Sequence, residues 1–422
     1  MAIAFPIIDW GNGTNIYEVN IRQYTLEGTF NAFIKHIPRL RNMGIDILWL
    51  MPVTPISVEK RQGTFGSYYA ASSYTNIDPA YGTEDDFREL ISTAHFFGMK
   101  VIIDWVANHT GYDHQWTKEH ADWYRKDEHG NFTELYGWVD VIDLNYEISA
   151  LRKGMIAAMK HWIENFDIDG FRCDMARTVP VDFWVEARGE CDSVKPLFWL
   201  AECEILNYHE SFDLTYGWEV MRAFDKYFKG EIKFEEIKPL LINYSHYPIG
   251  SRKLLFTSNH DENTYQGTEY EKYGPSAKAM AVFSCTWPGI PLIYSGQEKP
   301  NHKRLEFFEK DFIDWEGPVE LHGFYKTLLT IRKRNKALQE SASVLLLNTN
   351  APNALGYLCR RRKDRILVLM NLGKEAATFF IDHPALQGNY INLFSGMPVE
   401  IKRKETFTFQ PGEYVVYHIT YK

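Results

Sequence analysis

Cysteine is scarce in this sequence and is not arranged to bind a metal. The chain has five cysteines, an odd number, and no CxxC motif. At least one thiol is therefore unpaired, and a zinc site built on closely spaced cysteine pairs is excluded. Buried, reduced thiols are typical of a reducing compartment. We therefore expect a cytoplasmic protein, or a secreted or periplasmic one if a signal peptide has been removed.

Long apolar runs and long runs of one charge are also absent. No stretch reaches the roughly 20 apolar residues of a membrane-spanning helix, so no membrane span is expected. The formal net charge is -9, and the chain lacks the basic stripe that binding to nucleic-acid phosphates requires. We therefore expect no nucleic-acid partner, and a neutral, polar substrate fits this composition better.

Apolar residues are plentiful and follow the pattern of βα units. Hydrophobic residues make up 45% of the 422 positions, and short apolar runs alternate with amphipathic stretches over most of the chain. The runs predict seven strands, with a weaker eighth at Ser211–Leu214: Ile16–Ile21, Asp46–Leu50, Val101–Val106, Gly170–Asp174, Phe198–Glu202, Leu254–Ser258 and Pro291–Ser295. The stretches between them predict helices at Thr29–Met43, Thr83–Phe97, Ser149–Phe166, Pro180–Cys191 and Leu321–Arg334. The expected fold class is α/β, a (β/α)8 TIM barrel.

Two segments depart from this alternation. Residues 108–145 are a long polar stretch after the third strand, far beyond the two to six residues of a usual βα loop, and predict a small inserted subdomain. In residues 341–422 apolar and polar residues alternate as in β-strands, which predicts a C-terminal β-sandwich. The barrel would then consist of residues 1–107 and 146–340.

Polar side chains are concentrated where the predicted strands end. In a barrel of this kind, the carboxyl ends of the strands surround the active-site opening. Such groups occur on four strands: Asp104, Asn108 and His109 on the third, Arg172 and Asp174 on the fourth, Glu202 on the fifth, and His260 and Asp261 on the seventh. We expect these side chains to converge on one opening.

Two of these carboxyl groups have the arrangement that cleavage of an acetal requires. One carboxylic acid must protonate the leaving oxygen, and a second carboxylate must capture the oxocarbenium-like centre. Asp174 and Glu202 lie on neighbouring strands about 5 Å apart, which matches the carboxyl separation of about 5–5.5 Å in retaining glycosidases. We interpret Asp174 as the nucleophile and Glu202 as the general acid/base.

Nearby charges should decide which of the two carboxyl groups holds a proton. Arg172 points to the same face of its strand as Asp174, and its charge is expected to keep Asp174 ionised. Crowding by Asp174 and Asp261 is expected to raise the pKa of Glu202. Taken alone, an Arg–Asp pair is as often an ion pair in a barrel wall. The functional interpretation therefore depends on the joint occurrence of these groups.

The motifs resemble those of the α-amylase superfamily, glycoside hydrolase family 13, over nearly the whole chain. Four motifs match the family's sequence regions in order, and two more support them: DWVANH (104–109), GFRCD (170–174), AE (201–202), FTSNHD (256–261), GSYY (66–69) and VIDLN (141–145). The resemblance implies that Asp174 is the nucleophile, that Glu202 is the acid/base, and that Asp261 is a third catalytic carboxylate. It also implies five substrate-binding and two supporting residues, namely Tyr69, His109, Arg172, Arg177 and His260, and Asp104 and Asn108.

One departure from the family pattern concerns metal binding. Many family members carry Lys-His where this chain has Arg177-Thr178. Arg177 would replace the lysine, but the missing histidine places the family's calcium site in doubt. Asn108 and Asn145 are too few neutral donors for a cation that prefers six to eight ligands. No cofactor is expected to be required, and the metal is left unassigned, with calcium as the candidate.

The resemblance implies a retaining hydrolase of α-1,4 bonds, with a starch-like α-glucan or a maltooligosaccharide as the substrate. The short insertion should leave the cleft open at both ends, which favours an endo-acting α-amylase. The alternatives are a maltogenic amylase or α-glucosidase, a glucanotransferase and, in a different class, a catalytically silent glucan-binding protein. The intact carboxylates argue against the last alternative. The sequence leaves the oligomeric state open.

Overall fold

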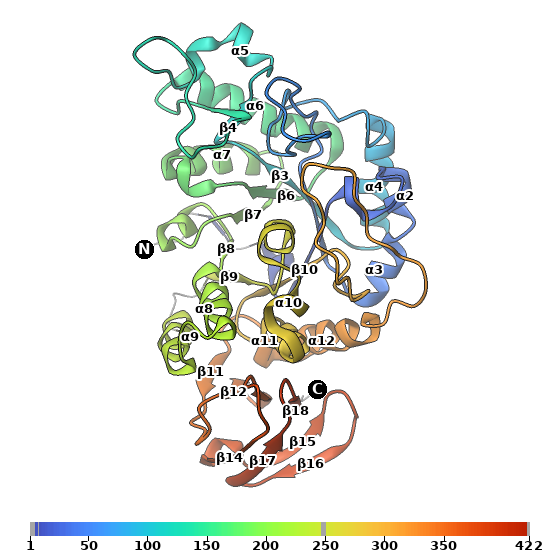
Figure 1. The fold of residues 1–422 in the computed structure, drawn as a ribbon, viewed down its shortest axis with the longest axis vertical. Coiled ribbons are helices and arrows are strands. Elements are labelled where there is room, and N and C mark those ends of the chain that lie inside the picture. The colour runs from blue at the N-terminus through green and yellow to red at the C-terminus, as the bar shows by residue number, and fades with distance from the viewer. Residues whose placement is uncertain (1–4, 7, 246–249, 420–422) are drawn as a thin grey trace.

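The computed structural model describes residues 5–245 and 250–419 except residue 7, and its centre is a closed parallel barrel (Figure 1). The strands follow one another around the barrel in the order β1-β10-β9-β8-β7-β6-β3-β2. Their bounds are β1 Ile16–Val19, β2 Ile47–Leu50, β3 Lys100–Trp105, β6 Gly170–Cys173, β7 Phe198–Ala201, β8 Leu214–Tyr216, β9 Arg252–Leu255 and β10 Ile290–Tyr294. This arrangement confirms the predicted (β/α)8 barrel.

The inside of the barrel is packed with large apolar side chains rather than open. The buried residues of this inner core come from all parts of the barrel and include Ile16, Ile47, Trp49, Ile102, Leu200, Leu214, Leu254 and Leu292. Because every second residue of a strand points inward, seven of the strands contribute one or two of these side chains each, and β6 contributes none. The polar residues that follow the strands therefore lie above this packed apolar core, at the carboxyl end of the barrel.

Helices surround the barrel and cover the outer faces of its strands (Figure 1). The longer ones are α3 Ile37–Met43, α4 Glu84–Phe96, α6 Ser149–Phe166, α7 Val181–Asp192, α8 Trp218–Lys229, α9 Ile237–Ser245, α11 Ala277–Thr286 and α12 His322–Arg334. Shorter ones are α1 Ile21–Tyr24, α2 Phe30–Ile34, α5 Trp116–Glu119 and α10 Glu269–Tyr273. No helix in the described ranges is long and apolar enough to span a membrane.

The structure corrects the prediction in two places. The single helix expected at Thr29–Met43 is two helices, because Pro38 lies in the first turn of α3 and has no N–H with which to continue α2. The weak eighth strand is displaced along the chain to Leu214–Tyr216. The segment before it forms a 3-10 helix, Leu206–Glu210, and a turn instead.

The segment between β3 and α6 lies at the end of the molecule farthest from the C-terminal sheets (Figure 1). It contains an antiparallel pair, β4 His109–Gly111 with β5 Val141–Asp143, and the short helix α5. Its aromatic residues Trp116 and Trp123 are buried: Trp116 packs against Tyr74 of the loop that follows β2, and Trp123 packs against Trp116. This packing fixes the segment over one side of the barrel opening.

The C-terminal part consists of antiparallel sheets. A six-stranded sheet has the order β11-β12-β13-β18-β15-β16, and β14 pairs with β17. Their bounds are β11 Ser343–Leu346, β12 Ala354–Arg361, β13 Asp364–Asn371, β14 Ala377–Asp382, β15 Gly388–Asn392, β16 Pro398–Ile401, β17 Lys404–Phe409 and β18 Tyr414–Ile419. Both sheets contribute to one apolar core, in which Phe379 and Phe409 of the small sheet join Leu358 and Leu369 of the large one. This confirms the predicted C-terminal β domain.

Candidate active site

The register of two barrel strands places Asp174 and Glu202 side by side. Cys173 of β6 pairs with Ala201 of β7, and each carboxyl residue follows directly at its strand end. The backbone N–H of Glu202 donates to the carbonyl oxygen of Cys173 at 3.0 Å, which keeps the two ends aligned. The two carboxyl groups therefore lie roughly one strand spacing apart, at about 5 Å.

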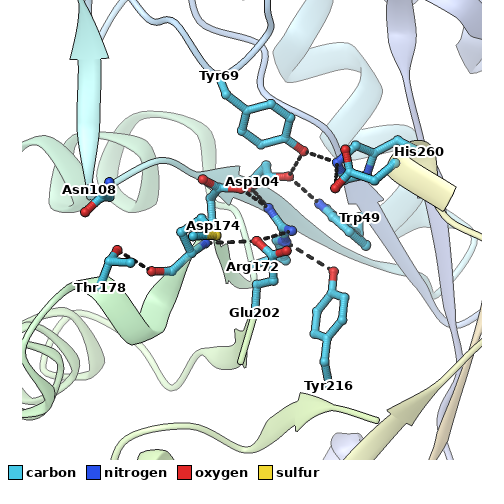
Figure 2. Close-up of polar contacts among 12 residues, drawn as sticks. Trp49, Tyr69, Asp104, Asn108, Arg172, Asp174, Thr178, Glu202, Tyr216 and His260 are labelled. Atoms are coloured by element: carbon cyan, nitrogen blue, oxygen red, sulfur yellow. Dashed lines mark hydrogen bonds and ion pairs between the residues drawn. The ribbon is translucent and has the colours of Figure 1, made fainter. Parts of the chain in front are cut away.

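The guanidinium of Arg172 is the buried centre of the carboxylate cluster (Figure 2). Its Nη1 lies 2.8 Å from Oδ1 of both Asp104 and Asp174. Its Nη2 lies 2.8 Å from Oε2 of Glu202, as an ion pair without the alignment of a hydrogen bond. The guanidinium side chain is 0% exposed, so this one cation is shared by three carboxyl groups in a nearly dry site.

Glu202 is the carboxyl group in which the proton is retained. Burial raises the pKa of Glu202 to about 7, with Arg172 lowering it and Asp174 and Asp261 raising it. The sequence predicted the direction of this shift but attributed it to like-charge crowding. Burial is the larger cause, because the apolar surroundings of β7 disfavour the charged form whatever its neighbours are.

Asp174 is also buried, and this opposes the charge of Arg172. Burial raises the pKa of Asp174 to about 6, while Arg172 lowers it and Asp104 raises it again. Arg172 therefore lowers the pKa of Asp174 as expected, but by less than burial raises it. At neutral pH Asp174 is ionised and Glu202 is about half protonated, which is the pair of states that double displacement requires.

Asp104 supports the cluster from β3. Its Oδ1 contacts Arg172, and its Oδ2 accepts hydrogen bonds from Trp49 Nε1 at 3.2 Å and from the hydroxyl of Tyr69 at 3.1 Å. Both oxygens accept hydrogen bonds, so Asp104 is held away from the reacting groups. Its position agrees with the supporting role that the sequence predicted for it.

The predicted residues surround a cavity of about 250 Å³. Six of them line it, namely Tyr69, His109, Asp174, Glu202, His260 and Asp261. Arg172 and Asp104 lie behind this wall and contact it from below. The Asp261 side chain is 40% exposed, so it reaches into the opening rather than into the buried cluster.

Asn108 and Arg177 lie outside the cavity wall. Asn108 is buried, and its side-chain amide is 3.2 Å from Nδ1 of His109, so it orients that ring from behind. Burial lowers the pKa of His109 to about 4, which keeps the ring neutral. Arg177 is exposed in a short 3-10 helix after Asp174, and its side chain does not contribute to the lining.

Sequence reasoning missed several residues of this site. Most of them come from loops with no distinguishing pattern: Gln62, Trp138, Asp140, Tyr265, Phe307 and Phe308. Glu18 is different, because it is a charged residue inside the apolar strand β1 and is 0% exposed. A charge at such a position is costly unless it is paired, and that signal could have marked it.

The described residues contain no group of three or more His, Cys, Asp or Glu side chains arranged to hold a metal ion. The oxygen donors nearest the family's calcium motif are few. The amide of Asn108 faces His109 and Asp143, and Oδ1 of Asn145 accepts the N–H of Glu147. These residues do not fit a six- to eight-coordinate calcium site without additional ligands.

Three carboxyl groups around one cavity, at the carboxyl ends of a parallel (β/α)8 barrel, define a glycoside hydrolase. The chain belongs to the alpha-amylase family. The model of the alpha-amylase catalytic domain matches residues 9–133 and 121–316, which include every predicted site residue.

Several characterised proteins resemble this chain over most of its length. A maltogenic alpha-amylase from Thermotoga neapolitana is 30% identical, with a TM-score of 0.89, and the match covers 97% of this chain and 99% of that one. An alpha-amylase from Lactobacillus plantarum is 29% identical, with a TM-score of 0.86 and the same coverage. Alpha-amylase MalA from Haloarcula japonica is 26% identical over 87% of this chain, which spans only 57% of that relative's length.

Proposed function

We propose that this protein is a retaining hydrolase of α-1,4-glucosidic bonds in starch-like glucans and maltooligosaccharides. One observation carries the proposal: Asp174 and Glu202 share the guanidinium of Arg172 and line the same cavity. Their strand-neighbour spacing leaves no room for a water between the sugar and Asp174. This geometry supports a covalent intermediate rather than direct attack by water.

In the first step, Glu202 donates its proton to the glycosidic oxygen while Asp174 attacks the anomeric carbon. The C–O bond to the leaving sugar breaks, and a covalent ester forms between the sugar and Asp174. The proton must come from Oε1 of Glu202. Its Oε2 already faces two donors, the backbone N–H of Met175 at 2.9 Å and Nη2 of Arg172 at 2.8 Å.

In the second step, Glu202 acts as a base. It removes a proton from a water that enters the vacated side of the cavity, and that water displaces Asp174 from the anomeric carbon. Two inversions restore the α configuration. Glu202 regains its proton and Asp174 returns to its ionised state, so the site is ready for the next bond.

Asp261 and His260 are placed to hold the sugar that reacts. Both line the cavity, and Nε2 of His260 lies 3.4 Å from Oδ2 of Asp261. Carboxylate and imidazole groups are good partners for vicinal hydroxyls. Tyr69 lies beside them, with its ring stacked on that of Phe307 at an interplanar angle of 11°.

The mode of attack has two candidates. The shortness of the segment after β3 favours a cleft open at both ends, as in an endo-acting α-amylase. That segment nevertheless contributes Trp138 and Asp140 to the cavity wall, which narrows the opening. Phe307 and Phe308, from the loop after β10, close the wall further. A maltogenic mode is supported by this enclosure and by the similarity to the Thermotoga enzyme.

A time course on amylose tests the proposal. Product lengths are followed by chromatography and anomeric configuration by NMR, with Asp174→Asn and Glu202→Gln as inactive references. Mixed oligosaccharides of α configuration from the first time points are expected of an endo-amylase, and maltose alone of a maltogenic enzyme. Products of β configuration, or unchanged rates in both variants, would contradict the proposed mechanism.

A further inference from the structure

Glu18 is a buried carboxylate that reaches the active site from the far side of the barrel. It lies in the middle of β1 and is 0% exposed. Its Oε1 is 2.5 Å from Nδ1 of His260, a residue 242 positions away. Its backbone carbonyl oxygen accepts hydrogen bonds from both the N–H and the hydroxyl of Ser295 in the segment after β10. Because β1 also pairs with β2 and β10 at this residue, the backbone of Glu18 is fixed in position by two neighbouring strands.

The hydrogen-bond partners of His260 determine its protonation state. Glu18 can only accept, so Nδ1 of His260 carries a hydrogen. The other ring nitrogen, Nε2, lies 2.8 Å from the hydroxyl oxygen of Tyr69 (Figure 2). Tyr69 has a single hydroxyl hydrogen, and Asp104 takes it. Nε2 must then donate as well, and His260 is the doubly protonated imidazolium.

Burial raises the pKa of Asp104 to about 6 although Arg172 lowers it, so Asp104 is ionised at neutral pH and accepts the hydrogen of Tyr69. Each of its oxygens accepts a hydrogen bond from another donor, Oδ1 from Arg172 and Oδ2 from Trp49. A chain of hydrogen bonds thus runs from Glu18 through His260 and Tyr69 to Asp104, and ends at the guanidinium shared by the catalytic carboxylates. All its members are at least nine-tenths buried.

We propose that Glu18 is a positioning residue of the reaction: its carboxylate orients His260 and holds it as the imidazolium that faces Asp261 and the reacting sugar. This inference rests on the proposed function, because it concerns the same cavity. Glu18 touches neither the cavity nor the substrate. It acts through His260, whose Nε2 would otherwise become an acceptor and compete with Asp104 for the hydrogen of Tyr69.

The charges around His260 agree with this role. Burial lowers the pKa of His260, but Asp261 and Glu18 raise it more, so that it reaches about 9 despite the opposing charge of Arg172. The other groups that face the ring are Tyr69, stacked at 25°, and the edge of Trp49. Asp261 is 40% exposed and becomes occupied by sugar hydroxyls, whereas Glu18 is permanently buried. Glu18 is therefore the constant counter-charge.

A purely structural role explains Glu18 poorly. Its second oxygen, Oε2, is buried and has no hydrogen-bond partner in the described part of the chain. A buried carboxylate oxygen without a partner destabilises the fold, and an apolar side chain would pack there at lower cost. Glu298 shares this feature, so what distinguishes Glu18 is its hydrogen bond to His260 in the cavity wall. We therefore assign to the Glu18 carboxylate the role of orienting and charging His260.

Glu18→Gln tests the proposal, because it keeps the shape and removes the charge. Histidine side chains are labelled with ¹⁵N, and the His260 signals are assigned by their loss in His260→Asn. We expect the pKa of His260 to fall from about 9 to about 5–6 in Glu18→Gln, so that the ring is largely neutral at pH 7. On maltooligosaccharides kcat should fall about 10- to 100-fold, with KM changed by less than about threefold.

The pH dependence of activity in Glu18→Gln distinguishes a positioning role from a general loss of structure in the variant. At low pH His260 stays protonated without help, so the activity of Glu18→Gln should approach that of the wild type as pH falls and diverge from it as pH rises. The double variant Glu18→Gln/His260→Asn should lose no more activity than His260→Asn alone, because the two residues act as one unit.

Glu298→Gln is the matched control. Glu298 is another buried glutamate, 0% exposed, which accepts from the hydroxyl of Tyr17 at 2.7 Å and pairs with Arg39 away from the cavity. Its loss should lower the melting temperature but leave the His260 titration and the shape of the pH profile unchanged.

An unchanged His260 titration in folded Glu18→Gln, or a loss of activity that is equal at all pH values, would overturn the inference. If Glu18→Gln does not fold, Glu18→Asp takes its place: its retracted carboxylate should lower both the His260 pKa and kcat, and an unchanged pair of values would overturn the inference equally. If the wild-type protein releases no sugar from amylose, the proposed function fails, and the titration alone decides the role of Glu18.

Discussion

The backbone N–H of Met175 donates a hydrogen bond of 2.9 Å to Oε2 of Glu202. Met175 adopts a left-handed conformation with φ of 42°, which is rare for a residue with a side chain and turns its N–H back toward the site. This turn directly after Asp174 links the two catalytic carboxyl groups. It leaves Oε1 of Glu202 as the oxygen that carries the proton.

Glu202→Gln should separate protonation of the leaving group from nucleophilic attack. On amylose, loss of the general acid is expected to slow glycosyl transfer by about 10²- to 10⁴-fold. On α-maltosyl fluoride, whose leaving group needs no proton, the first step should be nearly normal and appear as a burst of fluoride. Asp174→Asn should show neither a burst of fluoride from α-maltosyl fluoride nor cleavage of amylose. An equal loss on both substrates in Glu202→Gln would contradict its role as the acid.

Activity should have a bell-shaped pH dependence with a maximum between about 6 and about 7. Below this window Asp174, with its pKa raised to about 6, becomes protonated and loses its nucleophilicity. Above it Glu202, with its pKa raised to about 7, loses the proton it must donate. The two apparent values belong to the coupled pair. Profiles of kcat/KM measure them, and Glu202→Gln should abolish the alkaline limb seen with amylose.

Glu202→Gln should also stabilise the fold at neutral and alkaline pH. The pKa of Glu202 is raised on folding, so its protonated form favours the native state, and this contribution is lost as pH rises through about 7. The variant has no proton to lose. Its free energy of unfolding should therefore exceed that of the wild type by about 1–3 kcal/mol at alkaline pH and match it below the unfolded pKa of about 4.5.

Chemical denaturation at several pH values measures this difference. Glu271→Gln is the control of opposite sign, since hydrogen bonding to Arg304 lowers the pKa of this surface carboxylate. It should give no stabilisation at any pH. A Glu202→Gln protein that is less stable than the wild type at alkaline pH would show that the ion pair with Arg172 outweighs the cost of burying the charge.

Phe307→Ala should weaken substrate binding more than it slows the chemistry. Phe307 lines the cavity and stacks on Tyr69, with ring centroids 6.3 Å apart. Removing this apolar wall should raise KM about 3- to 10-fold and change kcat by less than about twofold. Steady-state kinetics on maltooligosaccharides measure both. Phe380→Ala, an exposed position on β14, should change neither, and a kcat-dominated loss in Phe307→Ala would give that loop a catalytic role instead.

The positions of Asp174 and Glu202 could be predicted because their signals are local. Each follows a short apolar run, and the end of a barrel strand is where side chains face the opening. The supporting position of Asp104 followed from the same rule. Arg177 is exposed and lies outside the cavity lining, so its contact with a sugar stays a prediction.

The sequence by itself determined the barrel, the C-terminal β domain and the set of residues that meet at the opening, because periodicity and strand ends are properties of contiguous residues. Only the tertiary structure decided how these residues act on one another. Glu18 contacts His260 from a distant part of the chain, and Arg172 contacts Asp104 and Glu202 of other strands. The burial that raises the pKa of Glu202 likewise depends on the folded chain around it. Charge states depend on desolvation and on distances across strands, and neither quantity is encoded in any local stretch of residues.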